Sequence, residues 1–306
     1  MLSVVIPTRN HSEYISKLIG NLLSYPDLVS EIIICNDAST DETEAILSQY
    51  SHIPKLKLFK NDVNIGAVAS NCFMYKFVKN EYLTFMSSDD YFFADEMLKL
   101  LYEMKEKNAN LGFGKYKIEY QGVSESFEHP GWRNLNVVPN NFVNLFVSDL
   151  YIFLGVSIFK KSAIDQLVRN CKPFELEFDS LVKFDGLGEF RAHDWNLTLE
   201  ISLLDNDKVV FVNSEMGVFR KVANQLSSDA KYVHTGRSAF EMALLIHKYY
   251  KIQSARQILT KDSVLNEKIK RLLISKFAQM HDQYKNTDVY IEMYYPVIKS
   301  ALTLMD

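Results

Sequence analysis

Up to residue 90, short apolar segments alternate with segments whose apolar residues recur at helical spacing. The apolar segments predict four buried strands, at residues 2–6, 31–35, 56–59 and 82–86. The segments between them predict three helices, at residues 13–23, 41–50 and 67–77. This alternation is typical of a parallel sheet joined by right-handed helical crossovers, so we expect an α/β fold.

The pattern changes after residue 90. Apolar spacing predicts one more helix over residues 94–107, then strands at 111–120 and 208–212, with another apolar run at 152–159. Residues 121–141 hold Gly, Pro and Asn and predict a loop. Earlier in the chain, the strand at residues 2–6 is expected to stop at Pro7. The chain after residue 229 has helical spacing throughout.

These patterns divide the 306 residues into two parts. Residues 1–229 are expected to form one domain with two halves, at 1–100 and 101–229. Residues 230–306 are expected to form a helical C-terminal region.

Two adjacent carboxylates, Asp89 and Asp90, follow the predicted strand at residues 82–86. Open α/β sheets bind ligands at the carboxyl ends of their strands. Two carboxylates there repel each other, and hard cations such as Mg²⁺ take oxygen ligands, often one or two carboxylates together with substrate phosphates. The doublet therefore suggests a divalent metal and a diphosphate.

Polar residues also follow the other three predicted strands, at residues 7–10, 36–41 and 61–66. Each cluster alone is ordinary turn and helix-cap sequence. Together, four clusters on one edge would surround a single crevice. Asp37 there could accept hydrogen bonds from a base or ribose, or cap the next helix. Gly66 permits a close backbone approach or a positive φ, and Asn71 faces the crevice or water.

The first 100 residues resemble the nucleotide-binding half of family 2 glycosyltransferases, which have the GT-A fold. The matching segments are residues 3–8, 31–41 and 64–66 with Asn71, and Ser88 to Asp90. The resemblance implies a mostly parallel central sheet flanked by helices, with a nucleotide-binding half at residues 1–100 and an acceptor-binding half at residues 101–229. It also implies inverting transfer of a sugar from a nucleotide diphosphate donor, UDP by default, to a saccharide, lipid-linked or protein acceptor.

The same resemblance assigns roles to single residues. It implies that Asp90 holds Mn²⁺ or Mg²⁺, that Asp37 contacts the base and that Asp89 contacts the ribose side. The full set implied to bind the nucleotide is Pro7, Thr8, Arg9, Asp37, Asn64, Gly66, Asn71 and Asp89.

The second half matches the family less densely. Gly155 begins a segment that looks like the family's strand beside the donor sugar. Residues 190–195 are similar to its Glu-Asp-aromatic motif, with His193 in place of Glu. Carried over, Asp194 is the general base, although it could also be the N-cap of a helix starting at Trp195.

Residues 219–227 resemble the family's Arg-x-His-x-x-x-x-Ser stretch. Val222 stands where a metal- or diphosphate-binding His is frequent. Arg220 or His234 could substitute for that His, and Arg220 is therefore assigned to the donor phosphates together with Gly155. Val222 and His193 leave open a non-catalytic binding or scaffold protein of the same fold.

Two other enzyme classes fit less well. Nucleotidyltransferases also use carboxylates and a metal on an α/β sheet, but residues 7–10 lack their Gly-rich basic signature. A dinucleotide-dependent oxidoreductase would show Gly-x-Gly-x-x-Gly after the first strand, and none is present.

Charge and cysteine content limit the remaining classes. A net charge of −4 without a dense basic patch argues against a nucleic-acid partner. Three cysteines without Cys-x-x-Cys spacing, and no evident leader or spanning segment, predict a cytoplasmic protein. The helical region carries basic residues beside apolar ones and leaves three interpretations open: a solvated core helix, peripheral membrane association at the inner face, or a partner or homo-oligomer interface. These residues are Lys268, Lys270, Arg271 and Lys276.

Overall fold

The computed structural model describes residues 1–128, 142, 145–146, 152–170, 192–222, 236–261, 263–288 and 290–305. The strands are β1 (Leu2–Thr8), β2 (Val29–Asp37), β3 (Leu56–Asn61), β4 (Tyr82–Phe85), β5 (Tyr91–Phe92), β6 (Leu111–Tyr120), β7 (Val123–Phe127), β8 (Ile158–Lys160) and β9 (Val209–Lys221). Helices before residue 230 are α1 (Ser12–Leu23), α2 (Thr43–Ser48), α3 (Ala67–Tyr75), α4 (Ala94–Glu106), α6 (Lys161–Asn170) and α7 (His193–Leu204), with a 3₁₀ turn η2 (Leu154–Val156).

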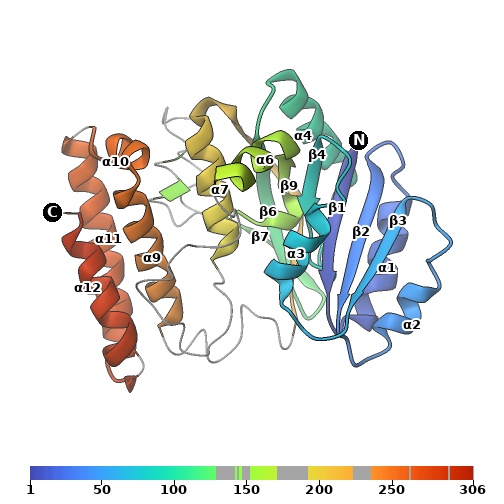
Figure 1. The fold of residues 1–306 in the computed structure, drawn as a ribbon, viewed down its shortest axis with the longest axis horizontal. Coiled ribbons are helices and arrows are strands. Elements are labelled where there is room, and N and C mark those ends of the chain that lie inside the picture. Colours follow the sequence, from blue (N-terminus) through green and yellow to red (C-terminus); the bar gives the residue numbers. More distant parts are fainter. Residues whose placement is uncertain are drawn as a thin grey trace.

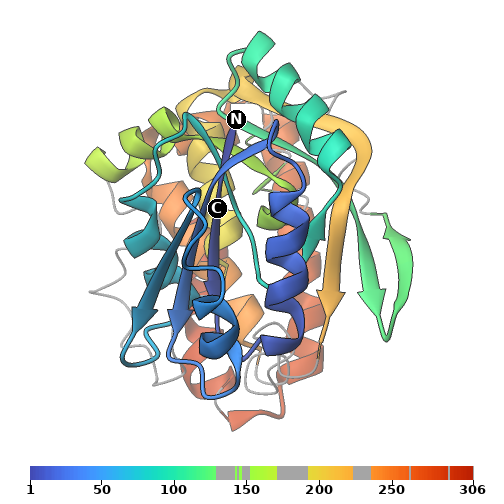
Figure 2. The same cartoon turned by 90° about the vertical axis from the view of Figure 1, so that its right-hand side faces the viewer.

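The strands form one mixed sheet in the order β3-β2-β1-β4-β8-β6-β9-β5, with β7 paired to β6. The predicted parallel core is confirmed, because β1 pairs in parallel with both β2 and β4, and β2 with β3. Figures 1 and 2 show α1 and α3 on opposite faces of these strands. Residues 2 and 4–6 of β1 are fully buried, as expected for a strand covered on both faces.

The prediction that Pro7 ends the first strand is wrong, since β1 continues to Thr8. Val5 accepts a hydrogen bond from Met86 N, so alternate residues of β1 point their polar backbone groups towards β4. Pro7, two residues on, points the same way, but β4 has already ended at Phe85. The proline therefore removes no ladder hydrogen bond.

The prediction of a loop over residues 121–141 is also wrong in part. Residues 123–127 form β7, which pairs antiparallel with β6. The connecting residues Gln121 and Gly122 have φ values of 50° and 80°. Positive φ at both central positions is the geometry of a type I′ hairpin turn, which Asn-Gly signals more strongly than Gln-Gly. Residues 129–141 lie outside the described residues.

The late strand is longer than predicted. β9 has 13 residues and pairs in parallel with β6 and antiparallel with β5. The ladder with β6 is irregular between Gly114 and Lys117, where the polar residues 213–215 of β9 interrupt its apolar pattern. The strand resumes after this irregularity, and this continuation carries Arg220 back to the carboxyl edge of β4.

The C-terminal region is helical in its described residues, as predicted. Its helices are α9 (Arg237–Lys251), α10 (Gln253–Thr260), α11 (Ser263–Tyr284) and α12 (Tyr295–Thr303), with a π-helical turn at Tyr290–Tyr294. Ile269 and Leu273 of α11 are buried, and Lys270 pairs with Glu267 at 3.7 Å. These contacts favour the interpretation of α11 as a core helix with a solvated face. The boundary at residue 229 stays a prediction.

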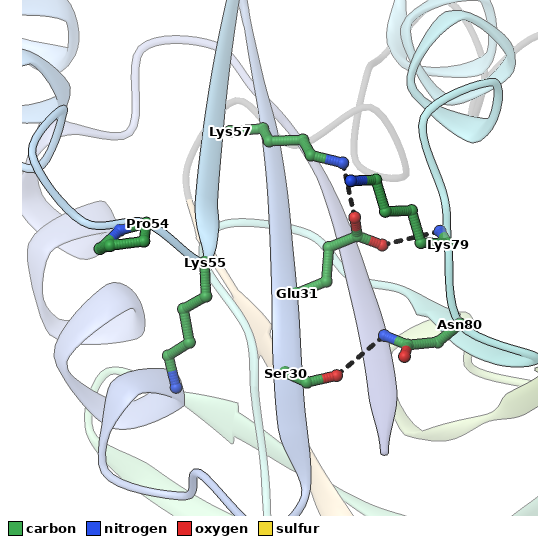
Figure 3. A pocket seen from close by; sticks show the side chains of 7 residues that line it. All are labelled: Ser30, Glu31, Pro54, Lys55, Lys57, Lys79 and Asn80. Carbon is green, nitrogen blue, oxygen red and sulfur yellow. Dashed lines mark hydrogen bonds and ion pairs between the residues drawn. The ribbon is translucent and has the colours of Figure 1, made fainter.

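A buried carboxylate ties the sheet together at the amino-terminal ends of its strands (Figure 3). Glu31 accepts hydrogen bonds from Ser3 Oγ at 2.6 Å, Lys57 Nζ at 2.6 Å and Lys79 N at 2.9 Å. A cavity of about 210 Å³ lies here, opposite the predicted nucleotide edge. Its lining residues are Ser30, Glu31, Pro54, Lys55, Lys57, Lys79 and Asn80. Burial raises the pKa of Glu31, but the three hydrogen bonds outweigh it, and the net pKa is lowered.

We expect Glu31→Gln to reduce the free energy of unfolding by about 1–3 kcal/mol at neutral pH, because three donors lose a charged acceptor. A lowered folded pKa contributes stability that is complete above the unfolded value near 4.5 and is lost as pH falls through the folded value. The difference between the two proteins should therefore shrink below about pH 4. Urea denaturation of both proteins at several pH values measures this difference in the free energy of unfolding.

Lys55→Gln is the matched control, because Lys55 lines the same cavity but donates to Val29 O. It should shift stability less than Glu31→Gln and without the acid dependence. Equal losses in both variants at every pH would contradict the role given to Glu31.

Candidate active site

Hydrogen bonds join the loop after β1 to the loop after β2. Asn10 adopts a positive φ of 55°, and its Oδ1 accepts a hydrogen bond from Thr40 N at 2.8 Å. Asp41 accepts from Ser12 N and Thr43 N, both at 3.0 Å. Burial opposes ionisation of Asp41, but the hydrogen bonds from Thr43 and Ser12 prevail and lower its pKa to about 2. The carboxylate thus joins the starts of α1 and α2.

Asp37 organises the loop between β3 and α3. Its buried carboxylate accepts hydrogen bonds from Asn61 Nδ2 at 2.8 Å, Ile65 N at 2.9 Å and Gly66 N at 2.8 Å. Asn64 Oδ1 also accepts from Gly66 N, at 3.1 Å. Asp37 therefore does not cap α2. Its predicted contact with a base stays a prediction, and the geometry gives it a second task, which is to hold residues 64–66 at the crevice.

Asn71 lies in α3 and is buried, so the alternative that it faces bulk water is wrong. Its Oδ1 has no hydrogen-bond partner in the part of the chain that the structure describes. Buried polar atoms are nearly always paired, and an unpaired one at a ligand edge is a candidate for a ligand contact.

The acidic doublet is buried at the end of β4, with Asp89 and Asp90 exposed by only 1% and 2%. Ser87 Oγ donates to Asp89 Oδ1, and His11 Nδ1 lies 4.0 Å from the same oxygen. Ser88 Oγ donates to Thr8 Oγ1 at 2.8 Å and lies 2.6 Å from His11 Nδ1. Thr8 is thus hydrogen-bonded to Ser88, and His11 lies between Ser88 and the carboxylate of Asp89.

Asp90 has one oxygen paired and one unpaired. Its Oδ1 accepts from Arg220 N at 2.7 Å, while its buried Oδ2 has no partner within the described ranges. Burial and the neighbouring charge of Asp89 raise the pKa of Asp90 well above its usual value, against the opposing effect of Arg220. An additional cation at Oδ2 would offset both the burial of the carboxylate and its repulsion by Asp89.

Arg220 reaches the doublet, as expected from its assignment to the donor phosphates. Its Nη1 donates to Asp89 O at 2.5 Å and its Nε to Glu119 Oε1 at 2.6 Å. The guanidinium carbon lies 5.1 Å from the Tyr14 ring centroid and 5.3 Å from that of Tyr91. The hydrogen bond from Arg220 lowers the pKa of Glu119. Arg220 is therefore held rigidly beside the carboxylates.

Sequence reasoning missed Glu119, Tyr14 and Tyr91. Tyr91 carried a signal, since it directly follows the doublet. Glu119 carried none, because it faces Arg220 only through the β6–β9 register beyond the irregular ladder.

Gly155 lies buried in η2, which is tied to β4 by a hydrogen bond from Thr84 Oγ1 to Leu154 O at 3.0 Å. A Cβ at Gly155 would lie 2.8 Å from the Phe153 ring. The absent side chain thus makes room for Phe153. Its predicted contact with the donor sugar stays a prediction.

Asp194 lies in the first turn of α7 and is 9% exposed. The helix begins at His193 with Ala192 at the N-cap, so the alternative that Asp194 is the N-cap is wrong. Asp194 Oδ1 accepts from Trp195 N at 2.7 Å. Burial and the charge of Asp194 both raise the pKa of Tyr116 in β6, which indicates that the carboxylate lies near that ring.

An aromatic row connects the two parts of the site. The ring centroids of Tyr116 and Phe153 are 5.4 Å apart, as are those of Phe153 and Phe219. Phe219 directly precedes Arg220 in β9.

The remaining predicted residues are Pro7, inside β1, and Arg9, exposed in the loop after it. His234, residues 190–191 and residues 223–227 lie outside the described residues.

Across the described ranges, no group of three or more His, Cys, Asp or Glu side chains could enclose a metal ion. A cation at Asp90 would thus take most of its ligands from a phosphate and water, which suits Mg²⁺.

Among the residues that the structure describes, no helix combines the length and apolar character that crossing a membrane requires.

A sequence model described as glycosyl transferase family 2 matches residues 3–167. This is more than half of the chain, which therefore belongs to glycosyl transferase family 2. The predicted GT-A fold is confirmed by likeness to Staphylococcus aureus TarS in complex with UDP-GlcNAc. That structure has a TM-score of 0.64 and 19% identity, and the match covers 99% of this chain and 80% of TarS residues 1–349.

A mannosyltransferase from Pyrobaculum calidifontis, in complex with GDP-Man and Mn²⁺, has the same fold. Its TM-score is 0.57 at 14% identity, over 99% of this chain and 85% of that one. Both structures support the fold alone.

Two curated relatives act on poly(ribitol-phosphate) by name. The S. aureus beta-N-acetylglucosaminyltransferase TarP is 29% identical over 214 residues, which is 67% of this chain and 63% of TarP. The Bacillus spizizenii beta-glucosyltransferase is 33% identical over 130 residues, which is 41% of this chain and 20% of that protein. The match thus spans less than two thirds of either relative.

We expect Gly66→Ala to lower the free energy of unfolding by about 1–3 kcal/mol, because its φ of 88° and ψ of 161° form a region open essentially to glycine alone. The change also strains the loop whose N–H groups bind Asp37. Gly20→Ala in α1 is the control, since its Cβ would meet nothing within 4 Å and alanine favours a helix. Urea denaturation should show a loss of stability for Gly66→Ala and a gain for Gly20→Ala. A change of the same sign in both variants would contradict the backbone strain inferred at Gly66.

Proposed function

We propose that this protein transfers a sugar from a UDP-sugar to a hydroxyl group of a polyol-phosphate polymer, with inversion at the anomeric carbon. The observation that carries the proposal is the buried Oδ2 of Asp90, which lies at the carboxyl edge of β4 beside Asp89 and has no partner among the residues that the structure describes. Family membership supports sugar transfer. The UDP-GlcNAc complex of TarS supports the donor, and the names of the two relatives support the acceptor.

The nucleotide is held at the edge formed by β1 to β4. Asp37 keeps the 64–66 loop in place, and the buried Asn71 Oδ1 offers an unused acceptor to a donor group of the ligand. Asp90 would hold a divalent cation through Oδ2, while Arg220 N fixes its Oδ1. When bound, such a cation offsets negative charge on the diphosphate as a Lewis acid.

Asp194 would act as the general base. It takes the proton from the acceptor hydroxyl as the oxygen attacks the anomeric carbon. The new carbon–oxygen bond forms as the bond to the diphosphate breaks, and that electron pair leaves with the nucleotide. Attack opposite the departing phosphate inverts the anomeric centre, so one base suffices where retaining glycosidases need two carboxylates. The hydrogen bond from Trp195 N to Oδ1 orients the carboxylate for this task.

Cytoplasmic location, peripheral membrane association and a homo-oligomer stay predictions from the sequence. Thermal-shift screening of nucleotide sugars with Mn²⁺, followed by a UDP-release assay, tests the donor and distinguishes an enzyme from a scaffold. A polyol-phosphate polymer added to that assay tests the acceptor. No stabilisation by any nucleotide sugar, with no nucleotide release, would refute the function.

Asp90→Ala should abolish the metal-dependent part of UDP binding, because the carboxylate oxygen proposed to bind the cation is removed. Isothermal titration of UDP with Mn²⁺ and with EDTA measures this part. Asp95→Ala is the control, since it removes an exposed carboxylate from the first turn of α4 nearby. Asp90→Ala protein that binds UDP as tightly as the control in Mn²⁺ would remove Asp90 from the site.

Asp194→Asn should leave UDP binding unchanged and reduce kcat at least about a hundredfold, in line with typical general-base contributions. Asparagine keeps the shape and can still accept the bond from Trp195 N, so the helix start is preserved. The measurements are turnover with a saturating UDP-sugar and titration of UDP. Turnover equal to that of the unaltered protein would show that another group takes the proton.

A further inference from the structure

The helix that carries Asp194 is buried almost all round. Nearly every residue of α7 from 194 to 202 is buried, and besides Asp194 the charged residue in this stretch is Glu200, which is paired with Lys248 of α9. Figure 1 shows α7 between the sheet and α9. A helix without a solvated face takes its position from its neighbours on both sides, so the C-terminal region determines where Asp194 lies.

Glu241 of α9 binds the first turn of α7 directly. The N-cap Ala192 has no capping side chain, and its N–H donates to Glu241 Oε2 at 2.9 Å. The first N–H groups of a helix have no partners within it, and a negative charge there is favourable. Glu241 thus supplies, from another helix, an acceptor for the N–H group at the start of α7.

Arg237 keeps this carboxylate charged inside the core. Its Nε donates to Glu241 Oε1 at 2.8 Å, and the two side chains are exposed by 3% and 0%. Burying such a pair often adds no net stability over apolar residues of similar volume. Its presence at this contact is therefore better explained by placement of the α7 start than by stability.

A second contact lies one turn further along α7. Tyr249 Oη and Lys248 Nζ each donate to Asn196 Oδ1 at 3.0 Å. Asp194 lies between the residues held in these two contacts, Ala192 and Asn196. Both ends of the turn that carries the carboxylate are therefore fixed by α9.

We infer that Glu241, kept ionised by Arg237, is a positioning residue that fixes Asp194 for proton transfer, with Tyr249 in a supporting role. This inference rests on the proposed function of Asp194. Misplacement of a reacting group by about 1 Å can reduce turnover about a hundredfold, so the contact matters to rate even where it adds little to stability.

The test compares two double variants that both lack the ion pair. Arg237→Met with Glu241→Leu removes the acceptor for Ala192 N–H, whereas Arg237→Met with Glu241→Gln retains one in the Gln side-chain carbonyl. We expect the Leu variant to lose roughly ten- to a hundredfold in kcat for UDP-GlcNAc hydrolysis, with unchanged titration of UDP. The Gln variant should recover most of that loss. A role confined to stability would not separate kcat from UDP binding in this way.

Hydrogen exchange gives a readout that is independent of activity. The amides of residues 192–196 should exchange faster in the Leu variant than in the Gln variant. Equal exchange, or equal turnover in the two variants, would overturn the inference. If the Leu variant does not fold, Tyr249→Phe takes its place. It should speed exchange at residues 194–196 and lower kcat without changing UDP binding, and unchanged exchange or kcat would count against the inference.

The wild type separates this test from that of the proposed function. A wild type that releases no nucleotide from any nucleotide sugar refutes the function, and with it the catalytic consequence inferred for Glu241. A wild type that turns over while the Leu variant matches it refutes the positioning role alone.

Discussion

Asp90 lies buried at the end of β4 with a second carboxylate beside it, and its charge must be balanced by groups from elsewhere in the chain. The balance comes from β9, where Arg220 gives its backbone N–H to Asp90 and its guanidinium to the Asp89 carbonyl. Glu119 and the rings of Tyr14 and Tyr91 then hold Arg220. These groups satisfy one oxygen of Asp90, and the other has no partner among the described residues. Much of the architecture around the crevice follows from this requirement.

The nucleotide edge was largely predictable from the sequence, because the information there is local. Buried parallel strands read as continuous apolar runs, and the polar residues that end them must meet at one edge. Thr8, Asp37, Gly66 and Asp89 are brought to that edge as expected. The hydrogen bonds of Asp37 to residues 61–66 were not foreseen, since turn-forming residues give no sign of which side chain will hold a loop.

The rest depended on long-range register, which single residues do not encode. The alternation in β9 is broken by residues 213–215, so its continuation to Lys221 and its pairing with Glu119 could not be deduced from apolar spacing. Likewise, an N-cap role was the alternative considered for Asp194, because acidic residues favour that position. The actual cap for the Ala192 N–H comes from Glu241, 49 residues away. Local propensity gives no access to a cap supplied by another helix.

The two carboxylates of the proposed mechanism are therefore held by different later parts of the chain. Asp90 depends on β9, and Asp194 depends on α9. Both supports lie outside residues 3–167, where the chain matches its family. Because proton transfer and departure of the diphosphate occur on opposite sides of one sugar, the distance between these carboxylates has to be kept while the ligand is exchanged. A base set in a buried helix and held by α9 meets that requirement independently of the groups that hold Asp90 at the nucleotide edge.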